Sequence, residues 1–391
     1  MDEIKALLKE IEKLVDTDEN KRRQSLWMSG EPAIRGEIQW HGIPAGYATK
    51  GDSMPITVEE MNAIWAGILG FGFDRYYREP EYYLKYLLMM KIEKFRQLND
   101  DTPIDRNIPI WLGIPYEAGM LGQKYFITEK EEPTFGKEPV ITESFGFNTE
   151  FDFEETDYLK TAKRFYQTIK NIVGSEFNVI FPFWIRGPQG MALYLRGYEK
   201  FLTDLYLDPE FAHRVLRYAT DAAKAYTAWR AEYLSDPIRK GDLFNDDIPI
   251  MSPEMYETFI FPYERELCDY FGGIYYWHSC GDTTPHITQI LRLPVLDLFD
   301  IGPGVKNKKQ AIQQIGQDKP TEIRFAADRC VQRADENEMQ KFVEETVESC
   351  RECQVEKYVI RVSGLSVLLG AKKDLEKLRT WIKVARRVLD G

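Results

Sequence analysis

The sequence predicts a single (β/α)8 barrel of the α/β class, with additional helices before it. The chain has 391 residues, of which 43% are hydrophobic and 29% charged, so it can build a large core and is too apolar for disorder. From residue 108 onward, short apolar runs alternate with long helical patterns, as parallel strands alternate with crossover helices. No G-x-G-x-x-G follows the first strand, which favours a closed barrel over a dinucleotide-binding open sheet.

The first 100 residues read mainly as packing helices. Three helices are expected there: Glu3–Val15, Thr57 to about Gly70, and Pro80–Leu98. Between the first two, Gly30–Pro55 is rich in Gly and Pro and too irregular for a helix, so it could form a lid or a cover. We therefore assign residues 1–100 to an N-terminal helical region packed on the barrel and residues 101–391 to the barrel itself.

Seven of the eight strands that a barrel needs can be assigned. They are Ile108–Leu112, Asn178–Phe183, Leu243–Asn245, Gly273–Trp277, Leu296–Ile301, Glu322–Ala326 and Tyr358–Val362. Helices such as Pro209–Tyr233, Pro253–Tyr270 and Glu338–Cys353 lie between them. Barrel enzymes build their active sites from the residues that follow the strands, so these positions are the first candidates for function.

Charge and composition exclude several classes of protein. With a formal net charge of −12, the chain lacks the positive field that nucleic-acid binding requires. No apolar run approaches the roughly 20 residues of a membrane-spanning helix, and the amphipathic, mixed-charge N-terminus does not resemble a signal peptide. Five cysteines, an odd number, are typical of reduced thiols, and we expect a cytoplasmic protein with no nucleic-acid or membrane partner.

His278 and Cys280 give the sharpest signal for chemistry. They stand two residues apart directly after the strand Gly273–Trp277. Imidazole and thiolate are preferred zinc ligands, and this spacing at a strand end can direct both side chains to one ion. The alternative is a buried cysteine beside a hydrogen-bonded structural histidine.

A catalytic zinc site needs a third protein ligand. Cys330, shortly after the strand Glu322–Ala326, is the preferred candidate because it could face the same mouth. Cys350 and Cys353 lie at the end of a helix, on the opposite face of a barrel, and are expected to be packing or solvent thiols.

Further polar and aromatic residues follow the strands. Asp246 and Asp247 follow Leu243–Asn245, and adjacent carboxylates at a buried strand end require a metal, a cation or a polar substrate. We assign Asp247 and Glu117 to catalysis as acid/base or ligand candidates, although either could be a solvated loop carboxylate. The expected substrate-binding residues, which also include two aromatic rings able to stack on a flat ligand, are Asp246, Arg186, Trp184 and Tyr276.

At these positions the chain resembles the uroporphyrinogen decarboxylase superfamily, which contains the decarboxylases and the zinc-dependent methyltransferases that act with corrinoid proteins. The similar stretches are IPIWLGIPYEAGMLGQKYF (Ile108–Phe126), RGPQGMALYLRGYEKFLTDLYLDPE (Arg186–Glu210), DDIPIMSPEMYETFIFPY (Asp246–Tyr263) and YYWHSCGD (Tyr275–Asp282). The resemblance implies one barrel with its site at the C-terminal mouth.

Two departures from the family patterns direct the functional hypothesis. The decarboxylases carry an Arg-rich R-Q-A-G-R-type clamp for substrate carboxylates, whereas this chain has Arg22-Arg23-Gln24-Ser25 without the Ala-Gly-Arg. The methyltransferases carry H-x-C and a third cysteine ligand 70 to 80 residues later, where this chain has Leu365 and Ser366. The third ligand is then expected from another strand end, with Cys330, Asp247 and Glu117 as candidates, unless the metal is absent.

The resemblance therefore implies a zinc-dependent methyltransferase component. It would move a methyl group from a small O-methyl donor, such as a methoxylated aromatic, or from an N-methyl donor, to the cobalt of a corrinoid protein. The alternatives are a decarboxylase, a thiol-accepting methylcobamide methyltransferase and a non-catalytic corrinoid-binding barrel. The implied cofactors are Zn²⁺ and a corrinoid carried by the partner protein.

Overall fold

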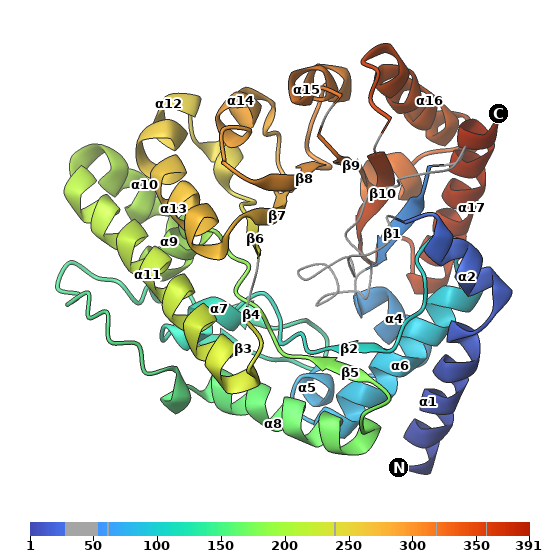
Figure 1. The fold of residues 1–391 in the computed structure, drawn as a ribbon, viewed down its shortest axis with the longest axis horizontal. Coiled ribbons are helices and arrows are strands. Elements are labelled where there is room, and N and C mark those ends of the chain that lie inside the picture. Colours follow the sequence, from blue (N-terminus) through green and yellow to red (C-terminus); the bar gives the residue numbers. More distant parts are fainter. Residues whose placement is uncertain (28–53, 61, 238–239, 318, 357) are drawn as a thin grey trace.

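The computed structural model describes residues 1–27, 54–60, 62–237, 240–317, 319–356 and 358–391. Within them, eight parallel strands form a barrel surrounded by helices (Figure 1). The eight are β1 (Ile56–Glu60), β2 (Asn107–Pro109), β5 (Asn178–Ile180), β6 (Gly241–Phe244), β7 (Ile274–His278), β8 (Leu296–Ile301), β9 (Thr321–Ala326) and β10 (Tyr358–Leu365). An antiparallel pair, β3 (Tyr125–Phe126) and β4 (Thr134–Phe135), lies in the connection after β2.

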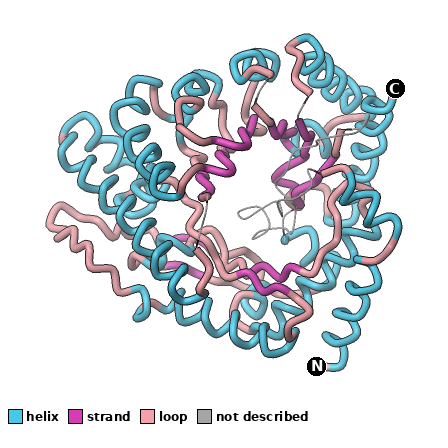
Figure 2. The backbone as a smooth tube through the Cα atoms, in the orientation of Figure 1, coloured by secondary structure: helices cyan, strands magenta, loops and turns pink. Residues whose placement is uncertain are grey.

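The barrel order follows from three sets of backbone contacts. One sheet runs β1-β10-β9-β8-β7-β6, and β2 pairs separately with β5. A parallel bridge between Arg186 and Phe244 joins the chain after β5 to β6. On the other side, the N–H of Asp101 donates to the carbonyl of Ile56 at 2.7 Å, which ties the segment before β2 to β1. The ring is visible end-on in Figure 2.

The helices form the outer layer. Before β2 these are α1 (Asp2–Val15), α2 (Asp18–Ser25), α4 (Asn62–Leu69), α5 (Phe73–Tyr76) and α6 (Pro80–Gln97). The middle of the chain adds α7 (Tyr116–Met120), α8 (Asp157–Val173), α9 (Pro188–Arg196), α10 (Tyr198–Leu207) and α11 (Pro209–Leu234). The remainder are α12 (Pro253–Met255), α13 (Phe261–Phe271), α14 (Ile287–Ile290), α15 (Lys308–Ile315), α16 (Glu336–Glu352) and α17 (Ala371–Asp390). None of these helices is long and apolar enough to cross a bilayer.

Strand β9 shows how the residue pattern builds the two layers. Ile323 and Phe325 lie on its outer face, where Phe325 packs 5.6 Å from Trp381 of α17, measured between ring centroids. The alternate residues, Glu322 and Arg324, are also buried but form ion pairs with each other and with neighbouring strands. Successive side chains of a strand point to opposite faces. The outer face of β9 therefore packs against helices, and its inner face carries the charged side chains.

The seven predicted strands are confirmed, but the eighth corrects the expectation for residues 57–70. We predicted one helix there, whereas Ile56–Glu60 is β1, paired in parallel with β10, and the helix α4 begins at Asn62. The barrel therefore starts well before the predicted boundary at residue 100. The predicted lid, apart from Met54 and Pro55, lies outside the described residues.

Candidate metal centre

Three potential metal ligands meet at the C-terminal mouth of the barrel. They are Asp246, which follows β6, His278, the last residue of β7, and Cys280, two residues further on. One donor atom from each lies within 4.8 Å of the other two. The Nε2 atom of His278 is 3.1 Å from Oδ1 of Asp246 and 3.3 Å from Sγ of Cys280. Among the described residues this is the one such group of three.

The pairing of β6 with β7 explains why these residues meet. Phe244 stands opposite His278 in the parallel ladder, so both strands end at the same level. The N–H of Asn245 donates to the carbonyl of His278 at 2.8 Å, and the N–H of Cys280 donates to Oδ1 of Asp246 at 3.0 Å. The chain after β7 is thereby held beside the chain after β6.

Two glycines after β8 allow this close packing. A Cβ atom on Gly302 would lie 2.0 Å from the carbonyl oxygen of Ser279, and one on Gly304 would lie 2.7 Å from that of Cys280. The N–H of Gly304 donates to the carbonyl of Cys280 at 2.9 Å. Larger residues at these positions would push the Cys280 turn away from His278.

Asp300 of β8 orients the imidazole of His278. Its Oδ2 lies 2.6 Å from Nδ1, and both side chains are fully buried. A proton on Nδ1 donated to this carboxylate leaves Nε2 to face Asp246 and Cys280, an arrangement typical of metal-binding histidines. Burial and Arg324 lower the pKa of His278, but the charges of Cys280 and Asp300 and the bond to Asp246 outweigh them and raise it well above its usual value. The surroundings of His278 thus favour positive charge at this ring.

Asp300 belongs in turn to an ionic network inside the barrel. Nε of Arg324 lies 3.1 Å from Asp300 and 2.8 Å from Glu322, and Nη1 lies 2.6 Å from Glu59 of β1. Arg361 of β10 reaches Glu322 at 3.1 Å. Residues of three other strands thereby support Asp300, the residue that orients His278.

Arg186, which follows β5, fixes the third ligand. Its Nη1 donates to Oδ2 of Asp246 at 2.9 Å, and its guanidinium lies over the ring of Tyr194, 5.2 Å from the centroid. Burial raises the pKa of Asp246, but the hydrogen bond and charge of His278 and the charge of Arg186 outweigh it and hold the pKa well below its usual value. Asp246 is therefore an anion in which one oxygen binds Arg186 and the other faces the cluster.

Asp247 lies next to the cluster but points to α10. The hydroxyl of Tyr198 donates to Oδ1 of Asp247 at 2.9 Å, while Oδ2 is buried and has no hydrogen-bond partner among the described residues. Burial and the charge of Asp246 raise the pKa of Asp247, against the hydrogen bond from Tyr198. A carboxyl group with a raised pKa beside a metal centre can act as a general acid.

The structure does not bring Cys330 to His278 and Cys280, so our preferred third ligand is corrected. Cys330 lies in a π-helical turn (Asp328–Gln332), is 2% exposed, and lines a separate cavity between α15 and α16. The turn after β9 directs its thiol to the helical layer rather than into the mouth. Asp246, which we had assigned to substrate binding, is instead the third member of the cluster with His278 and Cys280.

Two further candidates, Glu117 and Trp184, are buried and make structural contacts. Glu117 is buried and accepts hydrogen bonds from the backbone N–H groups of Ile185 and Arg186, at 3.1 and 3.2 Å. Trp184 is 4% exposed and packs on Tyr226 of α11. Both side chains are therefore enclosed by protein rather than exposed at the mouth.

Tyr276 lies two residues before His278 in β7, inside the ionic network. Its hydroxyl donates to Glu322 at 2.6 Å and accepts from Arg324 at 2.6 Å, and the residue is 1% exposed. A substrate in the mouth would not reach it. Asp300 and Arg324 were not among the predicted site residues. The available signal was that each is a charged residue within a largely buried strand.

The donor set suits zinc. Imidazole nitrogen, thiolate sulfur and carboxylate oxygen are its usual protein ligands, and three of them leave a position for substrate in catalytic sites. The position where the resembling methyltransferases carry a third cysteine is the end of β10, where Leu365 is buried and the carbonyl of Ser366 accepts a hydrogen bond from Gln332. Asp246, which follows another strand, offers a potential third donor.

Comparisons with known proteins agree with this architecture. A methyltransferase from Methanosarcina mazei has a similar structure, with a TM-score of 0.62 at 13% identity, covering 86% of this chain and 95% of that one. A D-psicose 3-epimerase aligns over 46% of this chain and 70% of its own, with a TM-score of 0.27 at 11% identity, too low to carry an argument. No protein of curated function matches the sequence. The uroporphyrinogen decarboxylase (URO-D) family model matches residues 81–387, and the chain belongs to this family.

Proposed function

We propose that this protein is a zinc-dependent methyltransferase that moves a methyl group from a small methylated donor to the cobalt of a corrinoid protein. The observation that carries the proposal is the cluster of Asp246, His278 and Cys280 at the barrel mouth, with Asp300 behind His278. Its donors match a catalytic rather than a structural zinc site, because they number three and lie at an open face. The fold shared with the Methanosarcina mazei methyltransferase is consistent with this activity.

The chemistry divides between the ion and the protein. A zinc ion held by these three residues would supply Lewis acidity at the oxygen or nitrogen that carries the methyl group. The methyl carbon leaves without the electron pair of its bond and is taken by cobalt(I) of the partner. The pair stays on the oxygen or nitrogen of the donor, which then needs a proton when it leaves as a neutral molecule.

Asp247 is our candidate for the source of that proton. Its raised pKa keeps the carboxyl group protonated at higher pH than an ordinary aspartate, and the hydroxyl of Tyr198 holds it at 2.9 Å. Arg186 acts differently, because it binds Asp246 and thereby positions a ligand. The methyl donor is an O-methyl compound, such as a methoxylated aromatic, or an N-methyl compound.

The face around the mouth suits a protein partner. Apolar residues that follow the strands remain exposed there: Ile114 after β2, Ile250 after β6, and Val367, Leu368 and Leu369 after β10. Exposed apolar residues that gather on one face mark interaction surfaces. A corrinoid protein that covers the mouth would bury them and bring its cobalt to the methyl group.

A decarboxylase of carboxylate-rich substrates is disfavoured by the place of the N-terminal arginines. Arg22 and Arg23 of α2 both bind Glu19, and Arg23 also donates to the carbonyls of Thr102 and Phe95. Arg23 is 2% exposed, so its guanidinium serves packing rather than substrate binding. The chain also departs from the pattern of the thiol-accepting methyltransferases, because the buried Leu365 stands where they carry their third cysteine.

The test is methyl transfer from methoxylated aromatics and N-methyl donors to a reduced corrinoid protein, followed by the absorbance change of the cobalt. We expect turnover by the wild type and by Cys330→Ser, and at least a hundredfold loss with Cys280→Ser, since a missing ligand removes the metal. Asp247→Asn should retain the metal but turn over about 10² to 10⁴ times more slowly. Full activity of Cys280→Ser, or tight partner binding with no turnover by the wild type, would contradict the proposal.

A further inference from the structure

A second cavity lies between α15 and α16, outside the barrel. It encloses about 620 Å³, a volume typical of sites for small metabolites. Its walls come from the loop before α15, the outer face of β9, the turn after β9, and α16. Figure 1 shows α15 and α16 as neighbours in the outer layer. None of its residues belongs to the cluster of Asp246, His278 and Cys280.

Lys308 gives this cavity its chemical character. Lys308 lines the cavity, and its Nζ atom is buried and has no hydrogen-bond partner among the described residues. An ammonium group without a partner is expensive to bury, so a site that retains one is built to receive an anion. Burial and the charge of Arg329 lower the pKa of Lys308 to about 8, against the opposing effects of Cys330, Asp300 and Asp282. An anionic ligand would restore the charged form.

Other positive groups surround the same point. Lys306 and Arg329 also line the cavity, and in the described part of the chain neither they nor Lys308 form an ion pair with a carboxylate. Lys308 is the first residue of α15, and the first turn of that helix contains no acidic residue. The N-terminus of a helix adds a partial positive charge. Two or more full charges and a helix end match a dianion better than a carboxylate.

The rest of the wall contains aromatic rings and three carboxylates of α16, Glu345, Glu348 and Glu352, of which Glu348 forms no ion pair among the described residues. Phe325 and Phe342 contribute rings, and Nζ of Lys308 lies 5.5 Å from the ring centroid of Phe325. Glu352 at the far end forms an ion pair with Lys309, and Glu345 is 3.8 Å from Lys341. The cavity thus has Lys306, Lys308 and Arg329 on the side of α15 and the turn after β9, aromatic rings along its wall, and carboxylates on α16.

We propose that this cavity binds a small phosphorylated metabolite, with its phosphoryl group against Lys308 and Arg329 and its apolar body against Phe325 and Phe342. The proposal is independent of methyl transfer, since it uses other residues and a binding readout. It assigns Lys308 and Cys330 to a ligand site that is separate from the metal centre.

The experiment is a calorimetric titration of the full-length protein with phenyl phosphate at low ionic strength. We expect saturable binding of one ligand per chain, and at least tenfold weaker binding to Lys308→Met. Lys9→Met, which removes an exposed lysine of α1, is the matched control and should bind as the wild type does. If Lys308→Met fails to fold by circular dichroism, Arg329→Gln decides, because its side chain is exposed and its loss should also weaken binding.

Two further titrations identify the ligand chemistry. Inorganic phosphate should bind more weakly than phenyl phosphate because it leaves the aromatic wall empty, and benzoate should bind more weakly because it carries one charge. Equal binding of inorganic phosphate would contradict the apolar part of the proposal, and tighter binding of benzoate would contradict the phosphoryl part. No binding of phenyl phosphate to the wild type, or unchanged binding to both Lys308→Met and Arg329→Gln, would overturn the whole proposal.

Discussion

Two groups of polar side chains inside the barrel differ in whether the protein supplies their cation. In the interior network, the carboxylates of Glu59, Asp300 and Glu322 all contact the guanidinium of Arg324 within 3.1 Å. At the mouth, Oδ1 of Asp246, Nε2 of His278 and Sγ of Cys280 face one another instead. In the interior group, the carboxylates are already paired with a guanidinium. In the mouth group, three electron-pair donors face a point where a cation can bind.

The two groups share one connection, the bond between Asp300 and His278. Asp300 contacts Arg324 with Oδ1 and His278 with Oδ2, so the network fixes the ring that presents Nε2 to the mouth. Substitutions in the network should therefore lower the stability of the fold strongly. They should affect metal binding indirectly, by changing the orientation of the His278 ring. Changes in the mouth group should affect the metal and leave the fold in place.

The largest expected effect on stability is that of Arg324→Met. It would leave the buried carboxylates of Glu59, Asp300 and Glu322 without this guanidinium, which costs about 3 to 5 kcal/mol of unfolding free energy. Chemical denaturation measures it. The control is Arg292→Met, which removes an exposed pair with Glu257 and should change stability by less than about 1 kcal/mol. Equal stability of the two variants would show that the network is not a support.

The next effect concerns Glu264 of α13, a buried carboxyl group bound by the hydroxyl of Tyr256 at 2.7 Å and the indole N–H of Trp277 at 3.1 Å. Burial raises its pKa from 4.5 to about 7, against these two hydrogen bonds. The folded state therefore holds a proton that the unfolded state releases, and stability falls as pH rises from about 4.5 to about 7.

Glu264→Gln should remove this pH dependence. Relative to the variant, the wild type should lose about 3 kcal/mol of unfolding free energy across that range, as the difference between pKa values of 4.5 and about 7 requires. Denaturation of both proteins at several pH values measures the difference. Glu322 is contacted by guanidinium groups, whereas Glu264 is expected to be a neutral acid in the folded state. Parallel profiles of the two proteins would contradict this expectation for Glu264.

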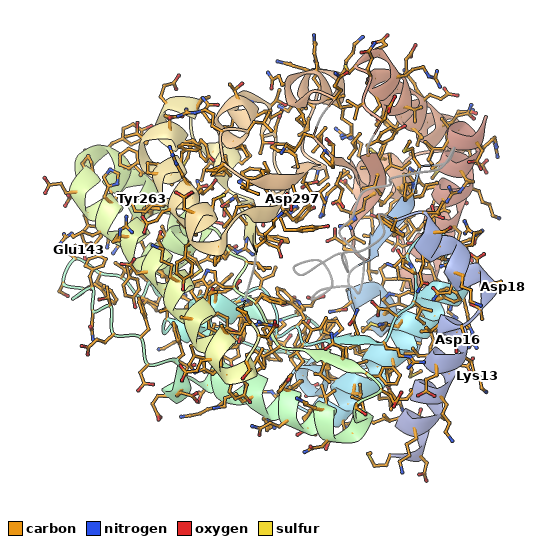
Figure 3. The ribbon with its side chains drawn as sticks, in the orientation of Figure 1. Lys13, Asp16, Asp18, Glu143, Tyr263 and Asp297 are labelled. Carbon is orange, nitrogen blue, oxygen red and sulfur yellow. The ribbon has the colours of Figure 1, made fainter. Side chains whose placement is uncertain are left out.

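The smallest expected effect is that of Asp300→Asn on metal affinity. Loss of the carboxylate behind His278 should weaken zinc binding roughly 10- to 100-fold without abolishing it. The control is Asp297→Asn on the same strand, because Asp297 pairs with Lys240 rather than with His278. Figure 3 labels Asp297 on β8 in the inner ring and Tyr263 of α13 in the outer layer. Competition with a chelator of known affinity measures both variants.

Most of the fold could be predicted because its signals are local. Apolar runs marked seven strands, and α1, α6, α11 and α16 begin and end within two residues of the predicted bounds. β1 was missed because Ile56–Glu60 leads directly into the apolar α4, and the two together resemble one helical pattern. Its β-branched residues, Ile56, Thr57 and Val58, were the available signal.

The site was predictable only in part, because its third member depends on contacts between strands. His278 and Cys280 are neighbours in sequence, and the structure brings them together. Between Asp246 and Asp247, only the register of β6 against β7 decides which carboxylate reaches His278. Cys330 was a reasonable choice by residue type, but the π-helical turn after β9 directs it to the other cavity.

The zinc content of protein purified without chelators tests the central claim most directly. We expect about one zinc per chain in the wild type and in Cys330→Ser, and nearly none in His278→Ala and Cys280→Ser, all with the same circular dichroism spectrum. Zinc that persists in His278→Ala and Cys280→Ser but is lost from Cys330→Ser would contradict the account, as would a wild type that binds no zinc when it is supplied.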